Sequence, residues 1–508
     1  MDILGLHVPR FTLSRRLHIP SGAAALCLLW VATGALAQTP AGPGNLVNAL
    51  TTLTNEGVYK FDALEFDAAA ANDAAYNALY PLCANSPATG APTGNCTGTT
   101  ALLFAKLRNL EDNANQFLGT GETAYSLRLS PEGLAAALRW TAPEEYAAQG
   151  SLATRFANSQ ASVLASRFSA LRFASHSLSL ADSDGSDIDI NDVVAAANYG
   201  ALGGGASGDI ADATFGRLSI FANGSFGTGD KGPTTFEDAF SFDDTEASVG
   251  ADYRLFSHWV VGVMAGHTER RVDFNSEQSI VDGKIRGNGQ GALAYFQYDG
   301  DLFYMNGSVG LQHLSLGTVR RITYPSNNPD VPSVNDTSLS NTGSNTLTAS
   351  SSAGMTLHWR GFAAEPYLNA QYMHVTINAF TEHSGEGFDF DVGEQHVTST
   401  QLAAGLKLQY ALLLPFGVIV PYAYGEYRHE FSDDTARLID STYAAVGNTV
   451  ATGMDLPTDA APNHYYIVGG GGTIVLKHGL QGFMQYYRVM DYANYTDHVV
   501  SGGLRWEF

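Results

Sequence analysis

Apolar and polar side chains alternate with period two along most of the chain from residue 217 onward. In the segment 397–412, Leu402 and Leu406 fall on one face, whereas Gln401 and Lys407 fall on the other. This alternation is typical of β-strands whose two faces meet different surroundings. Segments of about ten or more residues suit tilted strands that cross a membrane. Twelve segments fit the pattern: 217–226, 245–254, 258–267, 285–298, 302–315, 345–358, 362–377, 397–412, 416–431, 464–477, 481–490 and 497–508.

The connections between these segments alternate between short turns and long polar loops. We expect short turns at 255–258, 299–301, 360–361 and 413–415, and long loops at 227–244, 268–284, 317–345, 378–396 and 432–463. This asymmetry is expected of a transmembrane barrel. A soluble sandwich would also alternate, but strands this long and numerous would be unusual in it. The sequence therefore predicts an all-β membrane protein, in which residues 215–508 form a closed antiparallel transmembrane β-barrel of about 12 strands.

A small, mainly α-helical region, residues 38–177, precedes the predicted barrel. Its longest expected helix, 141–173, carries Arg155, Arg167 and Arg172 away from the apolar stripe. Those apolar residues are Phe156, Val163, Leu164, Phe168 and Leu171. Two interpretations stay open: the helix lies inside the barrel as a plug or tether, or it packs in a separate helical domain.

The first interpretation follows from the width of the lumen. A barrel of about twelve strands is too wide for its own side chains to fill. Arginines on a helix could give charge-assisted hydrogen bonds to acids on the inner wall. We expect Glu426 and Arg428 to form a charge pair in the lumen. The polar side chains predicted to face inward are Asn306, Asn369, Gln371, Lys407, Gln409 and Glu426.

Residues 178–214 are rich in Asp, Gly and Ser and predict a linker. The stretch Asp182–Asp192 has closely spaced acids that could bind calcium. Its glycine is at the fourth position rather than the sixth, and no glutamate occupies the twelfth. A solvated acidic linker is therefore the expectation, and a calcium site is the alternative.

The first 37 residues have the pattern of a secretory signal peptide. Arginines precede an apolar stretch at 21–31, which is too short to cross a bilayer. Ala35 and Ala37 form an A-x-A cleavage site, which leaves Gln38 as the first mature residue. The alternative is a short membrane anchor.

Cysteine usage and charge agree with export. Cys83 and Cys96 flank a Pro/Gly/Ser/Thr-rich loop, and in an oxidising compartment we expect them to form a disulfide. Lys and Arg number 27 against 50 Asp and Glu, so the net charge is −23. Nucleic acid is therefore excluded as a partner, because phosphate binding needs clustered basic residues.

The sequence offers no recognisable catalytic chemistry. It has no G-x-S-x-G or H-E-x-x-H motif, no P-loop, and no G-x-G-x-x-G with a flanking strand and helix. His176 is the single histidine between the signal and the barrel. We therefore expect no enzyme activity and no catalytic, cofactor-binding or metal-binding residues.

Several segments resemble the autotransporter family of type V secretion. They are GADYRLFSHWVVGVMAGH from Gly250, GDLFYMNGSVGLQH from Gly300, PFGVIVPYAYGEYRHEF from Pro415, and the terminal GLRWEF. The resemblance implies a monomeric twelve-stranded barrel in the outer membrane bilayer of a Gram-negative bacterium. It also implies a helix threading the lumen and an N-terminal passenger outside the cell.

The same resemblance assigns roles to particular residues. Leu504, Trp506 and Phe508 would form the signal that the barrel-assembly machinery recognises, with periplasmic chaperones as further partners. The stretch 162–172 is similar to the lumen helix of the family. Some members cut themselves there between two asparagines, but this chain has Ser162 and Val163 at the matching positions. The resemblance therefore does not imply self-cleavage here.

These observations predict a translocator that exports or displays its own short N-terminal region at the cell surface. A surface adhesin that acts through its acidic outer loops is the alternative. A surface hydrolase is a third hypothesis, from the enzyme class, and the missing catalytic motifs argue against it.

Overall fold

The computed structural model describes residues 44–84, 96–175, 179–181, 187–189, 217–256, 258–274, 280–359, 361–414, 416–432, 436–447, 453–476, 480–492 and 494–507. Ala35, Ala37 and Gln38, the residues of the predicted signal cleavage, lie outside this part. Most of the proposed calcium stretch and Phe508 also lie outside it. Within the predicted linker, β1 (Ser179–Ala181) pairs with β2 (Asp187–Asp189).

Twelve long antiparallel strands form one closed barrel, as the sequence predicts. Each strand pairs with its neighbours in chain order, and the last strand closes the barrel on the first, so neither keeps a free edge. The strands are β3 (Leu218–Lys231), β4 (Phe240–Phe256), β5 (Trp259–Phe274), β6 (Asp282–Asp299), β7 (Phe303–Tyr324), β8 (Val334–Met355), β10 (Phe362–Ile377), β13 (Gln395–Tyr410), β15 (Gly417–Glu430), β18 (His464–Leu476), β19 (Leu480–Met490) and β20 (Tyr495–Glu507). The short segments β9 (Leu357–Trp359) and β14 (Leu412–Leu414) extend the hairpins that precede β10 and β15.

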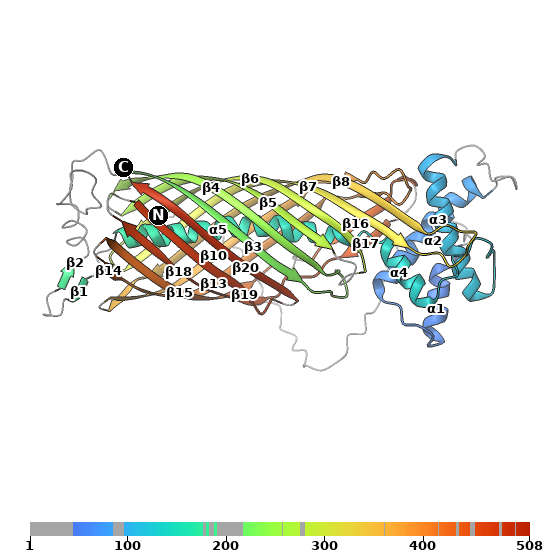
Figure 1. The fold of residues 1–508 in the computed structure, drawn as a ribbon, viewed down its shortest axis with the longest axis horizontal. Helices are drawn as coiled ribbons and strands as arrows, with labels where there is room; N and C mark the ends of the chain where they lie inside the picture. Colours follow the sequence, from blue (N-terminus) through green and yellow to red (C-terminus); the bar gives the residue numbers. More distant parts are fainter. Residues whose placement is uncertain are drawn as a thin grey trace, which may run out of the picture. The chain divides into compact units, whose positions relative to one another are not determined.

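The two ends of the barrel differ, and we call them the turn end and the loop end. Short connections at 257–258, 300–302, 360–361, 415–416 and 477–479 make up the turn end. The longer connections, with the hairpin between β19 and β20, make up the loop end (Figure 1). The barrel therefore has the turn-and-loop asymmetry expected of a membrane barrel.

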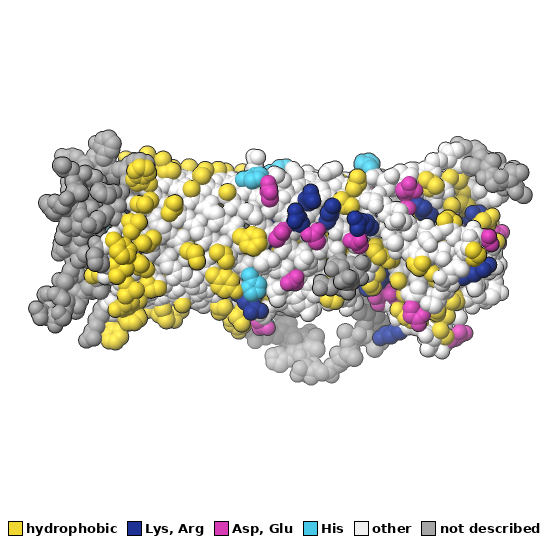
Figure 2. Space-filling view, in the orientation of Figure 1, with side chains coloured by type: hydrophobic (Ala, Val, Ile, Leu, Met, Phe, Trp, Pro, Cys, Tyr) yellow, Lys and Arg dark blue, Asp and Glu magenta, His cyan; other side chains and the backbone are white. Residues whose placement is uncertain are grey.

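The half of the barrel near the turn end carries apolar side chains outward. Leu311 is 67% exposed and Leu406 is 46% exposed, whereas Gln312 and Lys407 beside them are buried in the lumen. Figure 2 shows hydrophobic side chains gathered around this end. An apolar outer face with a polar lumen is the arrangement that a bilayer requires.

The half near the loop end reverses this alternation. Phe242, Val272 and Ile285 point inward and are buried, whereas Arg271 and Arg286 are exposed outside. The strands consequently extend well into segments 227–244, 268–284 and 317–345, which the sequence pattern assigned to loops. Those boundaries were wrong because the predicted pattern places apolar residues on the outside, whereas this part of the barrel has its apolar residues inside.

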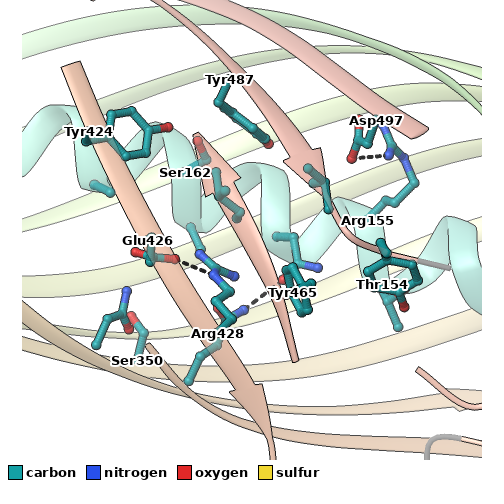
Figure 3. Close-up of a pocket in the computed structure, with 18 of the residues that line it drawn as sticks. Thr154, Arg155, Ser162, Ser350, Tyr424, Glu426, Arg428, Tyr465, Tyr487 and Asp497 are labelled. Carbon is teal, nitrogen blue, oxygen red and sulfur yellow. Dashed lines mark hydrogen bonds and ion pairs between the residues drawn. The ribbon is translucent and has the colours of Figure 1, made fainter. Parts of the chain in front are cut away.

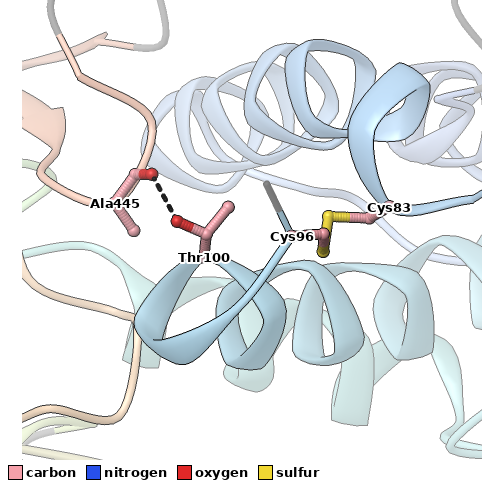
Figure 4. The surroundings of a disulfide bond; sticks show 4 residues. All are labelled: Cys83, Cys96, Thr100 and Ala445. Carbon is pink, nitrogen blue, oxygen red and sulfur yellow. Dashed lines mark hydrogen bonds between the residues drawn. A yellow bond between two sulfur atoms is a disulfide. The ribbon is translucent and has the colours of Figure 1, made fainter. Parts of the chain in front are cut away.

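Helices α1 (Leu46–Asn55), α2 (Ala63–Cys83), α3 (Gly98–Leu118) and α4 (Pro131–Thr141) lie at the loop end. Asp62 and Glu65 form a capping box at the start of α2, and the Ser130 hydroxyl caps α4 through the Gly133 N–H. Cys83 and Cys96 are joined by a disulfide between α2 and α3 (Figure 4). In the described part of the chain, no helix is long and apolar enough to cross a membrane.

Helices α1–α4 share one hydrophobic core with the barrel loops, and we call them the helical cap. Two long loops hold a four-stranded sheet of β11 (Phe380–Thr381), β12 (Phe390–Val392), β16 (Leu438–Tyr443) and β17 (Gly453–Pro457). Its Phe390 and Tyr443 are fully buried in the same cluster as Leu50 and Leu107 of the helices. The Tyr443 hydroxyl bonds to the Asn72 side chain at 2.5 Å. The loops therefore complete the core of the helical cap.

Candidate functional site in the barrel lumen

Helix α5 (Ala147–Ser175) runs through the lumen of the barrel (Figure 1). It contacts β3, β5, β6, β7, β8, β10 and β19. The single apolar stripe expected from the sequence is not maintained along the whole helix, because small, polar and apolar residues are mixed around its circumference. That composition suits a helix enclosed by a wall on every side, because both its polar and its apolar groups find partners there.

The upper anchor of this helix is Arg155, near the loop end. Its Nη2 lies 2.5 Å from Oδ1 of Asp244 on β4, and its Nη1 lies 2.5 Å from Oδ2 of Asp497 on β20. The guanidinium also bonds to the Tyr495 hydroxyl at 3.0 Å and stacks 4.0 Å from the Phe242 ring. Arg155 thus joins the helix to β4 and to the last strand, β20, which are the two neighbours of the first strand, β3.

The lower anchor is Arg167, near the turn end. It forms an ion pair with Asp252 on β4, with Nε 3.1 Å from Oδ2. The same carboxylate accepts bonds from the hydroxyls of Ser219 at 2.5 Å and Tyr295 at 3.2 Å. Arg167 is 2% exposed, so this pair is removed from water. Removing one partner of such a buried pair typically costs about 3–5 kcal/mol.

Between the anchors, neutral polar groups of the helix bond to the wall. Ser159 donates to Glu246 at 2.6 Å, and Gln312 donates to Gln160 at 2.8 Å. Near the turn end, an apolar cluster adds packing between helix and wall. It consists of Val163, Leu164, Phe168, Phe221, Val260, Met264, Leu293 and Tyr295. The helix is therefore held along its length.

The arginines of the helix were predicted from the sequence, but the acids that hold them were not. Asp244, Asp252 and Asp497 hold them, whereas Glu426, the acid expected to face the lumen, pairs with Arg428. The sequence does carry a signal for two of these aspartates, because positions 244 and 252 share the inward parity of β4. The predicted strand began at residue 245 and so left Asp244 out. The side chain of Arg172 lies outside the described part.

A cavity of about 530 Å³ remains in the lumen beside the helix (Figure 3). The charge pair of Glu426 and Arg428, predicted from the sequence, lines it, and the Tyr367 hydroxyl donates to Glu426 at 3.0 Å. Several tyrosines on neighbouring strands share this lining: Tyr422, Tyr424, Tyr465, Tyr487, Tyr492 and Tyr495. Such a lining can hold water and small ions. Among the described residues, no three His, Cys, Asp or Glu side chains are grouped to hold a metal ion.

The short helix η1 (Glu144–Tyr146), which leads from the cap into α5, lies at the loop-end mouth of the lumen. Tyr146 is fully buried and bonds to Ser340 at 3.2 Å and to Glu382. The Arg320 guanidinium makes a bidentate pair with Glu382 at 2.8 and 2.7 Å. Both partners of this pair are buried. The pair therefore holds the connection between β10 and β13, which contains β11, against the barrel wall and η1.

A second charged cluster lies at the same mouth. Arg139 of α4 bonds to Glu144 at 2.7 Å and to Asp238 of the β3–β4 loop at 3.1 Å. Burial raises the pKa of Glu144 to about 8, although the neighbouring Arg139 works in the opposite direction. Burial also raises the pKa of Glu145 well above its usual value. Burial therefore favours the uncharged form of both carboxyl groups at this mouth.

The geometry defines a class: an outer-membrane β-barrel whose lumen is occupied by the chain segment that precedes it. The family model described as autotransporter beta-domain matches residues 220–487. This match covers more than half of the chain, and the chain belongs to the autotransporter β-domain family. Barrels of this family are transport units of the Gram-negative outer membrane rather than enzymes.

Solved structures with a similar fold include three autotransporter domains. The translocator domain of NalP from Neisseria meningitidis has 14% identity and a TM-score of 0.45, covering 59% of this chain and 90% of that one. The β-domain of Bordetella BrkA has 16% identity and a TM-score of 0.40, covering 57% and 100%. The transport unit of AIDA-I from Escherichia coli has 13% identity and a TM-score of 0.36, covering 63% and 97%. A search of curated proteins finds no match.

Proposed function

We propose that this protein carries its own N-terminal region through its barrel and displays it, as the helical cap, on the outer side of the membrane. The direction of α5 supports this proposal. At the start of α5, the carbonyl of Ala147 accepts a bond at 2.7 Å from Arg437, which lies in the loop between β15 and β18. Near its end, Arg167 contacts Ser219 at the start of β3. The chain thus enters the lumen at the loop end and leaves at the turn end.

The direction of α5 supports export when it is combined with the orientation of such a barrel in the membrane. Short turns of outer-membrane barrels face the periplasm, and long loops face the outside. A secreted precursor reaches the outer membrane from the periplasm, so helices at the loop end have crossed the bilayer. The lumen is the passage that avoids exposing polar backbone to lipid. The barrel-assembly machinery and periplasmic chaperones are the partners that this route requires.

The shared core supports retention of the cap after export. Phe388, Phe390 and Tyr443 of the loops are buried against the helices, so the cap loses part of its core if it leaves. Burying one such aromatic side chain is worth about 1.5–3 kcal/mol. The helical cap is therefore displayed on the barrel and stays attached to it. The faces of the loops that bear these residues are covered, which disfavours adhesion through them.

Accessibility on intact cells tests this proposal. An epitope inserted after Glu56, in the exposed turn that follows α1, should bind antibody on whole cells and be removed by added protease. The matched control is the same epitope in the short turn at Gly300, which should be protected until the outer membrane is opened. Protection of the first epitope in cells with a folded barrel would show that the cap has not been exported.

A further inference from the structure

Two arginines approach one aspartate of the barrel wall at the upper anchor. Asp244 on β4 is directly opposite Arg270 on β5 in the sheet register. Its Oδ1 lies 2.5 Å from Nη2 of Arg155 on the helix and 3.8 Å from Nη1 of Arg270 on the wall. The helix thus makes the shorter of the two contacts, and the wall holds a second cation beside the same carboxylate.

The guanidinium of Arg270 is buried without a hydrogen bond. The residue is 3% exposed, and no described residue accepts a hydrogen bond from its Nε, Nη1 or Nη2. The Phe156 ring of the helix lies against this guanidinium, with its centroid 5.4 Å from Cζ. A ring at this distance attracts a cation, but it does not replace the hydrogen bonds that a buried guanidinium needs. The helix-filled lumen therefore places Arg270 in an unfavourable environment.

The acids of β4 near Arg270 depend on the helix for their partners. Glu246 is two residues from Asp244 on the same inward face of β4. One oxygen of Glu246 accepts a bond from Ser159 of the helix, and the other is buried without a hydrogen bond among the described residues. If the helix leaves the lumen, Asp244 loses Arg155 and Glu246 loses Ser159. Arg270 stays on the wall, directly opposite Asp244.

The lower anchor has a similar arrangement. Asp252 forms its ion pair with Arg167 of the helix, and Arg505 of β20 lies nearby, with Nη2 4.0 Å from Oδ1 of Asp252. The Nε of Arg505 also donates to the Ser219 hydroxyl at 3.2 Å, and this hydroxyl bonds to the same Asp252 carboxylate. Each anchor therefore combines one aspartate of β4, one arginine of the helix and one arginine of the wall.

We propose that Arg270 is a replacement partner for Asp244, which binds this carboxylate when α5 leaves the lumen and so stabilises the helix-free barrel. In the open lumen, water reaches the guanidinium, and the Asp244 oxygens released by Arg155 can accept its hydrogen bonds. In the filled lumen, Arg270 has neither. Arg270 therefore shifts the balance toward the open barrel. This inference rests on the proposed function, because a helix-free lumen is the passage that export requires.

Labelling of one cysteine in the lumen measures how often the helix is displaced. Ser225 on β3 is 6% exposed, and its hydroxyl lies 3.4 Å from that of Ser159 on the helix. In the purified full-length protein in detergent, Ser225→Cys should react with a bulky hydrophilic maleimide only when the helix leaves. Cys83 and Cys96 do not react, because they form a disulfide. Arg270→Met should lower the labelling rate about tenfold, because it removes a buried donor that lacks a hydrogen bond.

The effect of this substitution should change sign when Arg155 is absent. In Arg155→Met, Arg270 is the arginine that remains beside Asp244. Adding Arg270→Met then leaves a buried carboxylate without this cation, so the labelling rate should rise more than about a hundredfold. Arg428→Met is the matched control, because Arg428 lines the lumen and pairs with Glu426 on its own strand. It should leave the rate unchanged in both backgrounds.

The change of sign separates a replacement partner from a residue that only supports the wall. The same direction of change in both backgrounds, or no change in either, would overturn the proposal. Arg270→Lys keeps a cation beside Asp244 and should change both rates less than methionine does; equal changes would also overturn it. Arg270→Gln should act in the same directions as methionine, so the test stands if the methionine variant lacks the heat-dependent gel mobility of a folded barrel.

The labelling assay and the accessibility assay on intact cells can fail separately. Labelling in detergent does not require export. A change of sign in a protein whose cap is not exported would therefore refute the proposed function and leave the role of Arg270 intact. Export without the change of sign would refute the role of Arg270 alone.

Discussion

The lower anchor of the lumen helix offers a sharp test of what closes the barrel. Replacing Arg167 with Met leaves the Asp252 carboxylate buried, with Ser219 and Tyr295 hydroxyls as donors and Arg505 at 4.0 Å. Replacing Asp252 with Leu instead leaves a buried guanidinium that still donates a hydrogen bond to the Ser219 hydroxyl but has lost its carboxylate. Breaking a buried pair costs about 3–5 kcal/mol, and we expect the arginine variant near the lower figure and the aspartate variant near the upper one.

The free energy lost when the ion pair is broken raises the fraction of barrels in which the helix no longer fills the lumen. Because about 1.4 kcal/mol is a factor of ten, the ratio of open to helix-filled barrels should rise about 150-fold to 5,000-fold. Single-channel recordings of the full-length protein in planar bilayers measure that ratio as the fraction of time in a large-conductance state. The double variant Arg167→Met with Asp252→Leu should return toward the wild type, since an apolar pair can replace a buried ion pair.

A matched control uses another arginine that lines the lumen. Arg428 pairs with Glu426 on its own strand, so Arg428→Met should leave the opening ratio unchanged. If both single variants at the lower anchor also leave it unchanged, the ion pair does not hold the helix. If the double variant opens as often as the single variants, the effect comes from lost packing rather than from an unpaired charge.

Four further results are expected. Burial raises the pKa of Glu144 from its usual 4.5 to about 8, so the folded cap holds this proton more tightly than the unfolded chain. Its stability should therefore fall by an amount on the order of a few kcal/mol as the pH rises from about 4.5 to about 8, and Glu144→Gln should flatten that slope in thermal unfolding. Deleting Phe508 should lower the amount of folded barrel in outer-membrane fractions, and a normal amount would contradict its role in assembly. Leu406→Arg should lower the free energy of barrel unfolding by about 2–4 kcal/mol, and unchanged stability would contradict its lipid-facing position. Replacing Cys83 and Cys96 with Ser should destabilise the cap by about 3 kcal/mol, while the melting of the barrel strands should not change.

The sequence predicted the strands correctly where apolar residues face outward and polar residues face the lumen. In the half of the barrel near the turn end, outward residues such as Val309 and Leu311 are exposed, and inward residues such as Gln312 face the lumen. In the half near the loop end, β7 carries Leu314 and Leu316 inward instead. The prediction required apolar residues to face outward along the whole strand. It therefore ended each strand near the point where the apolar residues begin to face inward. The loops were therefore predicted too long.

The candidate site in the lumen was predicted only in part, because its geometry depends on tertiary packing. Arg155 and Arg167 could be found because charges on an otherwise enclosed helix need partners, but the partners depend on the angle and depth of the helix. Those are fixed by tertiary packing, which a single sequence does not encode in its local pattern. The joint core of the cap and loops was not foreseen either. Phe390 and Tyr443 lie in polar segments that look like ordinary loops until the helices are packed on them.

A disulfide engineered between helix and wall tests the central claim most directly, namely that α5 threads the barrel in the membrane. The hydroxyls of Ser159 and Ser225 lie 3.4 Å apart across the helix–wall boundary. Ser159→Cys with Ser225→Cys should therefore form a disulfide in intact cells, seen as a linked peptide after digestion of the heat-modifiable barrel. Ser159→Cys with Ser351→Cys, whose second position faces outward, should not. A folded barrel in the outer membrane without the first disulfide would contradict the account.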